Sequence, residues 1–148
     1  MHDSATSTQP AVGDPALPAA AIVLADDLIW SSRLAAGLRA LGVAPAVVAG
    51  LVPFERALGG ADHVVIDLTA RAYDGLEAVR LAAVRGAVVL CVAQHDDGEL
   101  RRAALAAGAR RVVPYRTMFE HGPATLRRWL TETATSAAHA TPPATAAR

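Results

Sequence analysis

Short apolar runs alternate with segments of helical periodicity through the middle of the chain. The apolar runs lie at residues 21–25, 43–49, 63–68, 87–92 and 111–114. Their lengths and the turn residues that bound them are typical of buried strands. Between the runs, apolar residues recur at helical spacing, as at Leu34, Leu38 and Leu41 before Gly42. The pattern predicts five strands, each followed by a helix.

Capping signals predict where several helices begin. Asp74 begins the helix after the third strand. Asp96 and Glu99 have the spacing of a capping box, which predicts the start of the helix after the fourth strand. Residues 117–120 repeat this spacing for a single turn. Residues 122–123, a Gly-Pro pair, are expected to break that turn and start the last helix.

The alternation of strands and helices predicts an α/β fold. We expect a single doubly wound, five-stranded parallel sheet of the flavodoxin-like kind, with strand order 2-1-3-4-5. Pro45 lies in the second run and lacks the N–H that a central strand needs, so this strand belongs at an edge. Residues 1–19 and 134–148 are rich in small and polar residues. They are expected to form a disordered leader and a disordered tail around a domain at 20–133.

The charge balance and composition argue against several classes of function. The chain has 14 basic residues, all arginine, and 14 acidic residues, so its formal net charge is zero. We therefore expect no direct binding to nucleic acid and none to a membrane. The single cysteine, Cys91, lies in an apolar run and is expected to be buried, in a cytoplasmic protein. The glycine loops of nucleotide-binding enzymes and the Gly-x-Ser-x-Gly elbow are missing, so we do not expect an enzyme.

Three acids follow the strands that flank the expected switch point of the sheet. Asp26 and Asp27 end the first strand, and Asp67 lies at the end of the third. Ligands of such sheets bind beyond the carboxyl ends of the strands, and converging carboxylates suit a hard cation such as Mg²⁺. The alternative is that these acids cap helices or end strands in contact with water.

The sequence around these acids resembles the receiver domain of bacterial response regulators. Asp67 is followed seven and eight residues later by Asp74-Gly75, as the phospho-acceptor of that family is. Asp26-Asp27 resembles the acidic pair of the family, and residues 106–109 resemble the segment before its fifth strand. The resemblance covers roughly residues 20–131. It implies that Asp67 accepts phosphate from a histidine kinase and that Asp26, Asp27 and Asp67 hold Mg²⁺.

The chain departs from the family at two positions that read the phosphoryl group. Receivers carry Ser or Thr at the end of strand four, where this chain has Ala93. They carry Lys at the end of strand five, where this chain has Tyr115 followed by Arg116, whose planar guanidinium is not equivalent to an ammonium. A phosphoryl group shifts an equilibrium only through contacts that differ between states. The resemblance is therefore to an atypical receiver, or pseudo-receiver, with degenerate switch residues.

The loops after the fourth and fifth strands hold a second set of candidate residues. His95, Asp96, Tyr115 and Arg116 lie in these neighbouring loops and are a candidate ligand or partner site. The alternative is that His95 and Asp96 cap the next helix and that Phe119 fills the core.

Three functions are consistent with these residues. The leading hypothesis is a non-enzymatic, receiver-like signalling module that needs no cofactor and binds a signalling protein through its fourth helix, fifth strand and fifth helix. The second is a phospho-accepting response regulator of a two-component system, with Asp67 as acceptor for a histidine kinase, Mg²⁺ as cofactor and Arg116 as the positive charge. The third is a flavodoxin-like sensor that binds a small ligand through His95 and Arg116. The sequence sets no oligomeric state.

Overall fold

The computed structural model describes residues 16–59 and 62–133. The predicted tail and most of the predicted leader lie outside these residues. Of the predicted leader, residues 16–19 are described, and Leu17 packs against the core. No helix of the described part is both long and apolar enough to cross a membrane.

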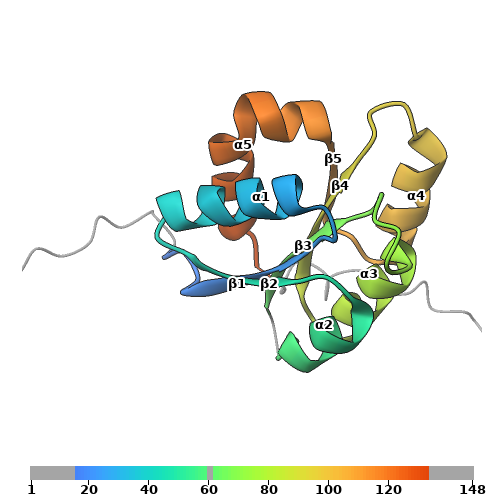
Figure 1. The fold of residues 1–148 in the computed structure, drawn as a ribbon, viewed down its shortest axis with the longest axis horizontal. Helices are drawn as coiled ribbons and strands as arrows, with labels where there is room; N and C mark the ends of the chain where they lie inside the picture. The colour runs from blue at the N-terminus through green and yellow to red at the C-terminus, as the bar shows by residue number, and fades with distance from the viewer. Residues whose placement is uncertain (1–15, 60–61, 134–148) are drawn as a thin grey trace, which may run out of the picture.

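The sheet has five parallel strands in the order β2-β1-β3-β4-β5, which confirms the predicted α/β fold (Figure 1). The strands are β1 (Ala20–Leu24), β2 (Ala44–Val48), β3 (His63–Asp67), β4 (Val88–Ala93) and β5 (Arg111–Pro114). Pro45 pairs with Ala21 on the β2 edge, where its missing N–H can face away from the sheet. Because β3 and β4 are covered on both faces, their sequences are almost continuously apolar.

Helices cover both faces of the sheet. They are α1 (Leu28–Ala40), α2 (Leu51–Ala57), α3 (Gly75–Val84), α4 (Gly98–Ala107) and α5 (Tyr115–Leu130). The α1 and α5 helices lie together on one face, and α2, α3 and α4 lie on the other (Figure 1). The loops that follow the carboxyl ends of the strands therefore lead to helices on both faces of the sheet.

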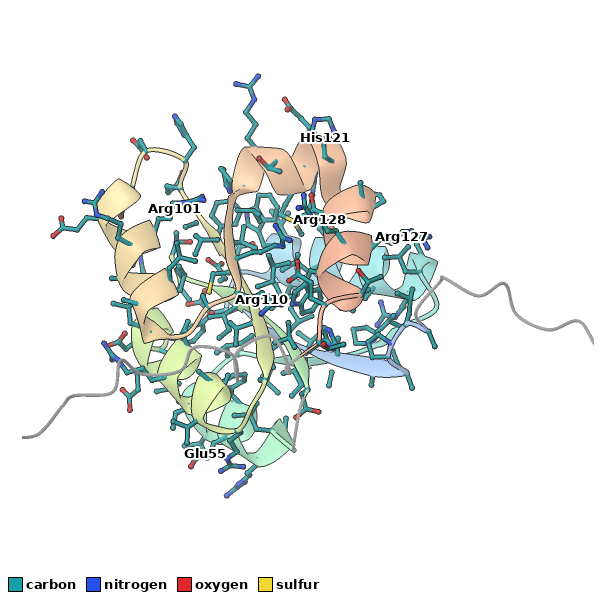
Figure 2. The ribbon with its side chains drawn as sticks, turned by 180° about the vertical axis from the view of Figure 1, so that it is seen from behind. Glu55, Arg101, Arg110, His121, Arg127 and Arg128 are labelled. Carbon is teal, nitrogen blue, oxygen red and sulfur yellow. The ribbon has the colours of Figure 1, made fainter. Side chains whose placement is uncertain are left out.

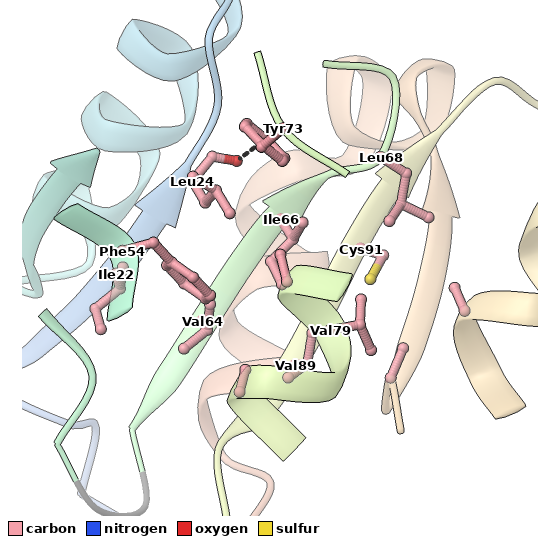
Figure 3. Close-up of a cluster of buried hydrophobic side chains, with 14 of the residues drawn as sticks. Ile22, Leu24, Phe54, Val64, Ile66, Leu68, Tyr73, Val79, Val89 and Cys91 are labelled. Atoms are coloured by element: carbon pink, nitrogen blue, oxygen red, sulfur yellow. Dashed lines mark hydrogen bonds between the residues drawn. The ribbon is translucent and has the colours of Figure 1, made fainter. Parts of the chain in front are cut away.

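Two apolar clusters, one on each face of the sheet, form the core. Figure 3 shows the cluster beneath α2 and α3, in which Phe54 of α2 and Val79 of α3 pack on strand residues that include Cys91 of β4. The Cys91 thiol is fully buried, as predicted. In the other cluster, Trp129 of α5 is fully buried, and its indole Nε1 donates a hydrogen bond to the Val88 carbonyl at 3.1 Å. The indole thus fastens α5 to the start of β4.

Two predicted helix starts are wrong. The N-cap of α4 is Asp97, whose carboxylate accepts from the Leu100 N–H at 3.0 Å, and not Asp96. Of two consecutive aspartates, the backbone path allows only one to take the capping position. The α5 helix begins directly after Pro114 rather than at a cap in residues 117–120. The predicted break is present as a local kink with non-helical dihedrals at His121.

Candidate functional site

A polar pocket lies at the carboxyl ends of β1 and β3. It has a volume of about 690 Å³ and is lined by Asp26, Asp27, Trp30, Asp67, Thr69, Arg71, Gln94 and Tyr115. The three acids predicted to converge do line one pocket. This follows from the strand order, because β1 and β3 are neighbours whose carboxyl ends meet at the same edge of the sheet.

The Asp67 carboxylate is buried and already engaged by hydrogen-bond donors. The residue is only 2 % exposed. Its Oδ1 accepts from the Thr69 N–H at 2.9 Å, from the Thr69 hydroxyl at 2.8 Å and from the Tyr115 hydroxyl. Three donor groups of the protein thus converge on one carboxylate oxygen of Asp67.

Tyr115 reaches Asp67 from the first residue of α5. Burial raises the pKa of the Tyr115 hydroxyl above its usual range, and the hydrogen bond to Asp67 raises it further. The hydroxyl therefore remains a neutral donor at physiological pH. It also lies 2.7 Å from the Thr69 hydroxyl. The Tyr115 and Thr69 hydroxyls have only two protons between them, and these are shared among three oxygen–oxygen contacts, namely Tyr115–Asp67, Thr69–Asp67 and Thr69–Tyr115. The Tyr115 ring packs against Trp30 of α1, with ring centroids 4.3 Å apart.

Tyr73 ties the two strands that carry the acids. Its hydroxyl lies 2.9 Å from the Leu24 carbonyl of β1 and 2.7 Å from the Asp67 carbonyl of β3 (Figure 3 shows the Leu24 contact). The side chain is buried, and burial raises the pKa of its hydroxyl well above the usual range. Tyr73 thus fixes the spacing between the end of β1 and the backbone of Asp67.

Asp26 and Asp27 organise the loops around the pocket. Asp26 Oδ2 accepts from the backbone N–H groups of Arg71 and Ala72, at 2.8 and 3.0 Å. Asp27 is the N-cap of α1, and its Oδ1 accepts a hydrogen bond from the backbone N–H of Trp30 at 2.9 Å. Of the two interpretations left open for these acids, helix capping holds for Asp27, while Asp26 binds the loop that follows β3.

The predicted magnesium site is not formed by the carboxylates as they are placed. Among the described residues, no three histidine, cysteine, aspartate or glutamate side chains are arranged to hold a metal ion together. Asp26, Asp27 and Asp67 each direct one carboxylate oxygen to donors of the protein. Each acid thus has one oxygen engaged by the protein, and binding of Mg²⁺ by the three acids together stays a prediction.

Most of the second predicted set of residues lies outside the acid pocket. His95 and Asp96 are exposed, and neither they nor Arg116 line the acid pocket. Arg116 instead pairs with Glu120 one turn along α5, at 2.9 Å, with its side chain 82 % exposed. Of this set only Tyr115 belongs to the pocket. The prediction that Arg116 supplies positive charge to the acids is therefore wrong.

The structure adds pocket residues that the sequence reasoning missed. Arg71 is the arginine that lines the pocket, and Thr69 and Gln94 supply a hydroxyl and an amide. Ala93 is buried at the end of β4, opposite Pro114 of β5, and offers no hydroxyl there. The alternative that Phe119 fills the core is also wrong, because this ring is 65 % exposed.

Comparisons with known proteins place the fold. No family model matches the chain, and no curated protein matches it. The beryllofluoride-activated receiver domain of DrrB, a Thermotoga maritima OmpR/PhoB homologue, matches with a TM-score of 0.66 and 23 % identity, over 76 % of this chain and 97 % of that chain. A response regulator receiver protein from Burkholderia phymatum gives 0.65 and 25 %, over 76 % and 95 %. The beryllofluoride-activated receiver-domain dimer of NtrC4 gives 0.65 and 19 %, over 76 % and 97 %. The chain has the fold of response-regulator receiver domains.

Proposed function

We propose that this chain is a receiver-like signalling module that acts through protein contacts and does not work as a phosphoryl switch. The observation that carries the proposal is the hydrogen bond from the Tyr115 hydroxyl to Asp67 Oδ1. A neutral hydroxyl stands where a receiver would present the ammonium of a lysine. It supplies one proton and no positive charge to an incoming phosphoryl group.

A phosphoryl group on Asp67 would meet few groups that could stabilise its charge. Such a group adds nearly two negative charges, which need new charge-assisted contacts to be held. Ala93 contributes no hydroxyl at the end of β4, and the acids Asp26 and Asp27 lie in the same pocket. Arg71 is the one positively charged side chain among the pocket residues, and it is exposed to water. A phosphorylated state therefore gains little over the unmodified one.

The face formed by α4, β5 and α5 supports a role in protein contacts. A groove of about 310 Å³ on this face includes Arg101, Leu105 and Thr117. The edge strand β5 leaves backbone groups unpaired by a neighbouring strand, and Arg101 covers one of them by donating to the Val112 carbonyl at 2.7 Å. Leu105 is 40 % exposed beside this edge. A strand edge next to an exposed apolar side chain is a suitable surface for a signalling partner.

Restoring the two missing groups tests the proposal. The double variant Ala93→Ser/Tyr115→Lys is incubated with acetyl phosphate and Mg²⁺, and phosphoryl incorporation is followed by intact mass. We expect little incorporation in the unmodified chain and at least about a tenfold gain in the double variant, since a positioned ammonium and hydroxyl stabilise charge that develops in transfer. Asp67→Asn, added to the double variant, should abolish the gain. Rapid Asp67-dependent incorporation in the unmodified chain would overturn the proposal.

The second candidate function, a working phospho-acceptor, is favoured by one observation. Asp26, Asp27 and Asp67 line a single pocket, as an acceptor site requires. In that case the positive charge would come from Arg71 and not from Arg116. Arg71→Ala would then abolish incorporation in the unmodified chain, whereas Arg116→Ala would not.

A further inference from the structure

A groove with three arginines lies along the edge strand β5. It has a volume of about 310 Å³, and none of the described residues that line it is acidic. Arg101 comes from α4, Arg111 is the first residue of β5, and Arg110 directly precedes it. Figure 2 shows Arg101 and Arg110 on the side of the molecule that carries α4 and β5. Because the formal net charge of the chain is zero, the groove is a local excess of positive charge that attracts anions.

Glu132 holds two of these arginines in place. Its Oε2 accepts a hydrogen bond from Arg110 Nε at 3.3 Å, and its Oε1 accepts one from Arg111 Nε at 2.6 Å. The Arg110 and Arg111 side chains are 29 % and 32 % exposed, so both are ordered and still reach solvent. A single carboxylate thus neutralises one of their two positive charges, and each guanidinium keeps further N–H donors for a ligand.

Arg101 adds a positive charge that no acid balances. Its Nη1 donates a hydrogen bond to the Val112 carbonyl at 2.7 Å, which holds the guanidinium beside β5. No ion pair joins Arg101 to an acidic side chain within residues 16–59 and 62–133. The three arginines and Glu132 together therefore leave a net charge of +2 at the groove.

This charge and the arginine side chains suit a phosphate dianion. A phosphate monoester carries nearly two negative charges at neutral pH and presents three strong acceptor oxygens. The planar guanidinium group donates to such oxygens in pairs, through hydrogen bonds that are stronger than those between neutral groups. A single carboxylate would neutralise only half of the charge of the groove.

The remainder of the groove is apolar. Leu105 of α4 and Pro114 of β5 line it, and Leu105 is 40 % exposed. The volume is at the lower end of the range for small-ligand pockets, and an inorganic phosphate ion would occupy only part of it. A ligand that fills the groove therefore carries an apolar or planar body beside its anionic group. Arginine also stacks on planar rings, so Arg101 can contact both parts of such a ligand.

We propose that this groove binds a small phosphate monoester with a planar ring, of about the size of a mononucleotide. Its phosphoryl oxygens accept from Arg101, Arg110 and Arg111, and its ring lies on Leu105 and Pro114. The inference goes beyond the proposed function, because it assigns a small molecule to this groove. It holds whether or not Asp67 accepts phosphate, since the groove and the acid pocket share no lining residue.

Other anions fit the groove less well. Inorganic phosphate would leave Leu105 and Pro114 in water. A single-stranded nucleic acid presents a phosphate at every nucleotide, whereas the net charge of the groove is only +2. A phosphorylated peptide has the same phosphoryl chemistry but no planar ring beside it, and the test separates it from a small molecule.

The test measures binding of adenosine monophosphate to the full chain by isothermal titration calorimetry. Adenosine, inorganic phosphate, a phosphoserine peptide and a short single-stranded DNA are the comparison ligands. Arg101→Ala removes the unbalanced charge, and Arg101→Lys keeps the charge but loses the planar fork. The matched control is Arg102→Ala, at the next position of α4, which is exposed and does not line the groove. Leu105→Ala shortens the apolar wall.

We expect saturable binding of adenosine monophosphate that weakens by at least about tenfold in Arg101→Ala and by about threefold or more in Arg101→Lys. Leu105→Ala should weaken it by at least about twofold, and Arg102→Ala by less than about twofold. Adenosine and inorganic phosphate should each bind at least about tenfold more weakly than adenosine monophosphate. Asp67→Asn should leave the binding unchanged.

Absence of saturable binding would overturn the proposal, as would equal weakening by Arg101→Ala and Arg102→Ala. Inorganic phosphate that binds as tightly as adenosine monophosphate would show that the groove does not recognise a ring. Tighter binding of the phosphoserine peptide or the DNA would overturn the assignment to a small molecule. A loss of binding in Asp67→Asn would place the ligand in the acid pocket instead. None of these outcomes measures phosphoryl incorporation at Asp67, so the two proposals fail separately.

Discussion

Three buried or partly buried groups govern how the stability of the domain changes at alkaline pH. The chain contains no lysine, the other side chain that titrates in this range. Burial raises the pKa of the Tyr73 hydroxyl and of the Cys91 thiol, and burial with the Asp67 hydrogen bond raises that of Tyr115. In an unfolded chain, tyrosine titrates near pH 10 and cysteine near pH 8.5, each as an approximate value. The pKa values of these groups are higher in the folded chain than in the unfolded chain. The free energy of unfolding is therefore at its full value below the unfolded pKa values, and it falls as the pH rises from there toward the folded pKa values.

The size of the loss can be worked out for the buried groups. Above its unfolded pKa, each group costs about 1.4 kcal/mol of unfolding free energy per pH unit. Between pH 7 and pH 11 this amounts to about 1.4 kcal/mol for Tyr73 and about 3.4 kcal/mol for Cys91. Tyr115 is partly exposed and contributes less. A loss of about 5 kcal/mol is comparable with the whole stability of many small domains.

Urea unfolding at a series of pH values from 7 to 11, followed by tryptophan fluorescence, measures this loss. Trp129 is fully buried and reports global unfolding. We expect the midpoint to fall with pH while the slope m stays constant. Cys91→Ala should remove the part of the loss that begins near pH 8.5, and Tyr73→Phe the part that begins near pH 10, as approximate values. A stability that stays flat to pH 11, or a loss that Cys91→Ala leaves unchanged, would refute the reasoning.

Three further substitutions test the packing by urea unfolding. Trp129→Phe removes the donor to the Val88 carbonyl and should cost about 1–3 kcal/mol; an unchanged midpoint would contradict that role of the indole. Gly108→Ala places a Cβ 2.5 Å from Ala83 Cβ at a φ of +119° and should cost about 1–3 kcal/mol; full stability would mean that α3 and α4 can separate freely. Glu132→Gln breaks ion pairs with two arginines and should cost about 1 kcal/mol at low salt and less at high salt; a cost independent of salt would point to packing instead.

Much of the fold could be predicted because its local and global signals agree. The β3 and β4 strands are apolar on both faces, Pro45 marks an edge, and Asp74 caps α3 with hydrogen bonds to Leu76 and Glu77. The errors arose where neighbouring residues offer equivalent signals. Consecutive aspartates can each cap a helix, and the sequence does not say which one the backbone presents to the first turn.

The candidate site could be predicted in its acids but not in its tyrosines. The strand order alone brings Asp26 and Asp67 to one pocket. The contact between Tyr115 and Asp67 joins residues 48 positions apart and depends on the direction in which the chain leaves Pro114. No motif encodes that direction. The one available signal was that Tyr115 stands where a receiver carries lysine, which marked the position without showing that its hydroxyl reaches the acid.

The most direct test of the account is a titration of the chain with beryllofluoride, a phosphoryl mimic, in Mg²⁺, followed by tryptophan fluorescence. Trp30 contacts Tyr115 and lines the pocket, while Trp129 is buried far along α5, so a signal change reports the site. The account predicts no saturable change in the unmodified chain and a saturable change in Ala93→Ser/Tyr115→Lys that Asp67→Asn abolishes. A saturable change in the unmodified chain that Asp67→Asn abolishes would show that the pocket still reads a phosphoryl group, and would contradict the central claim.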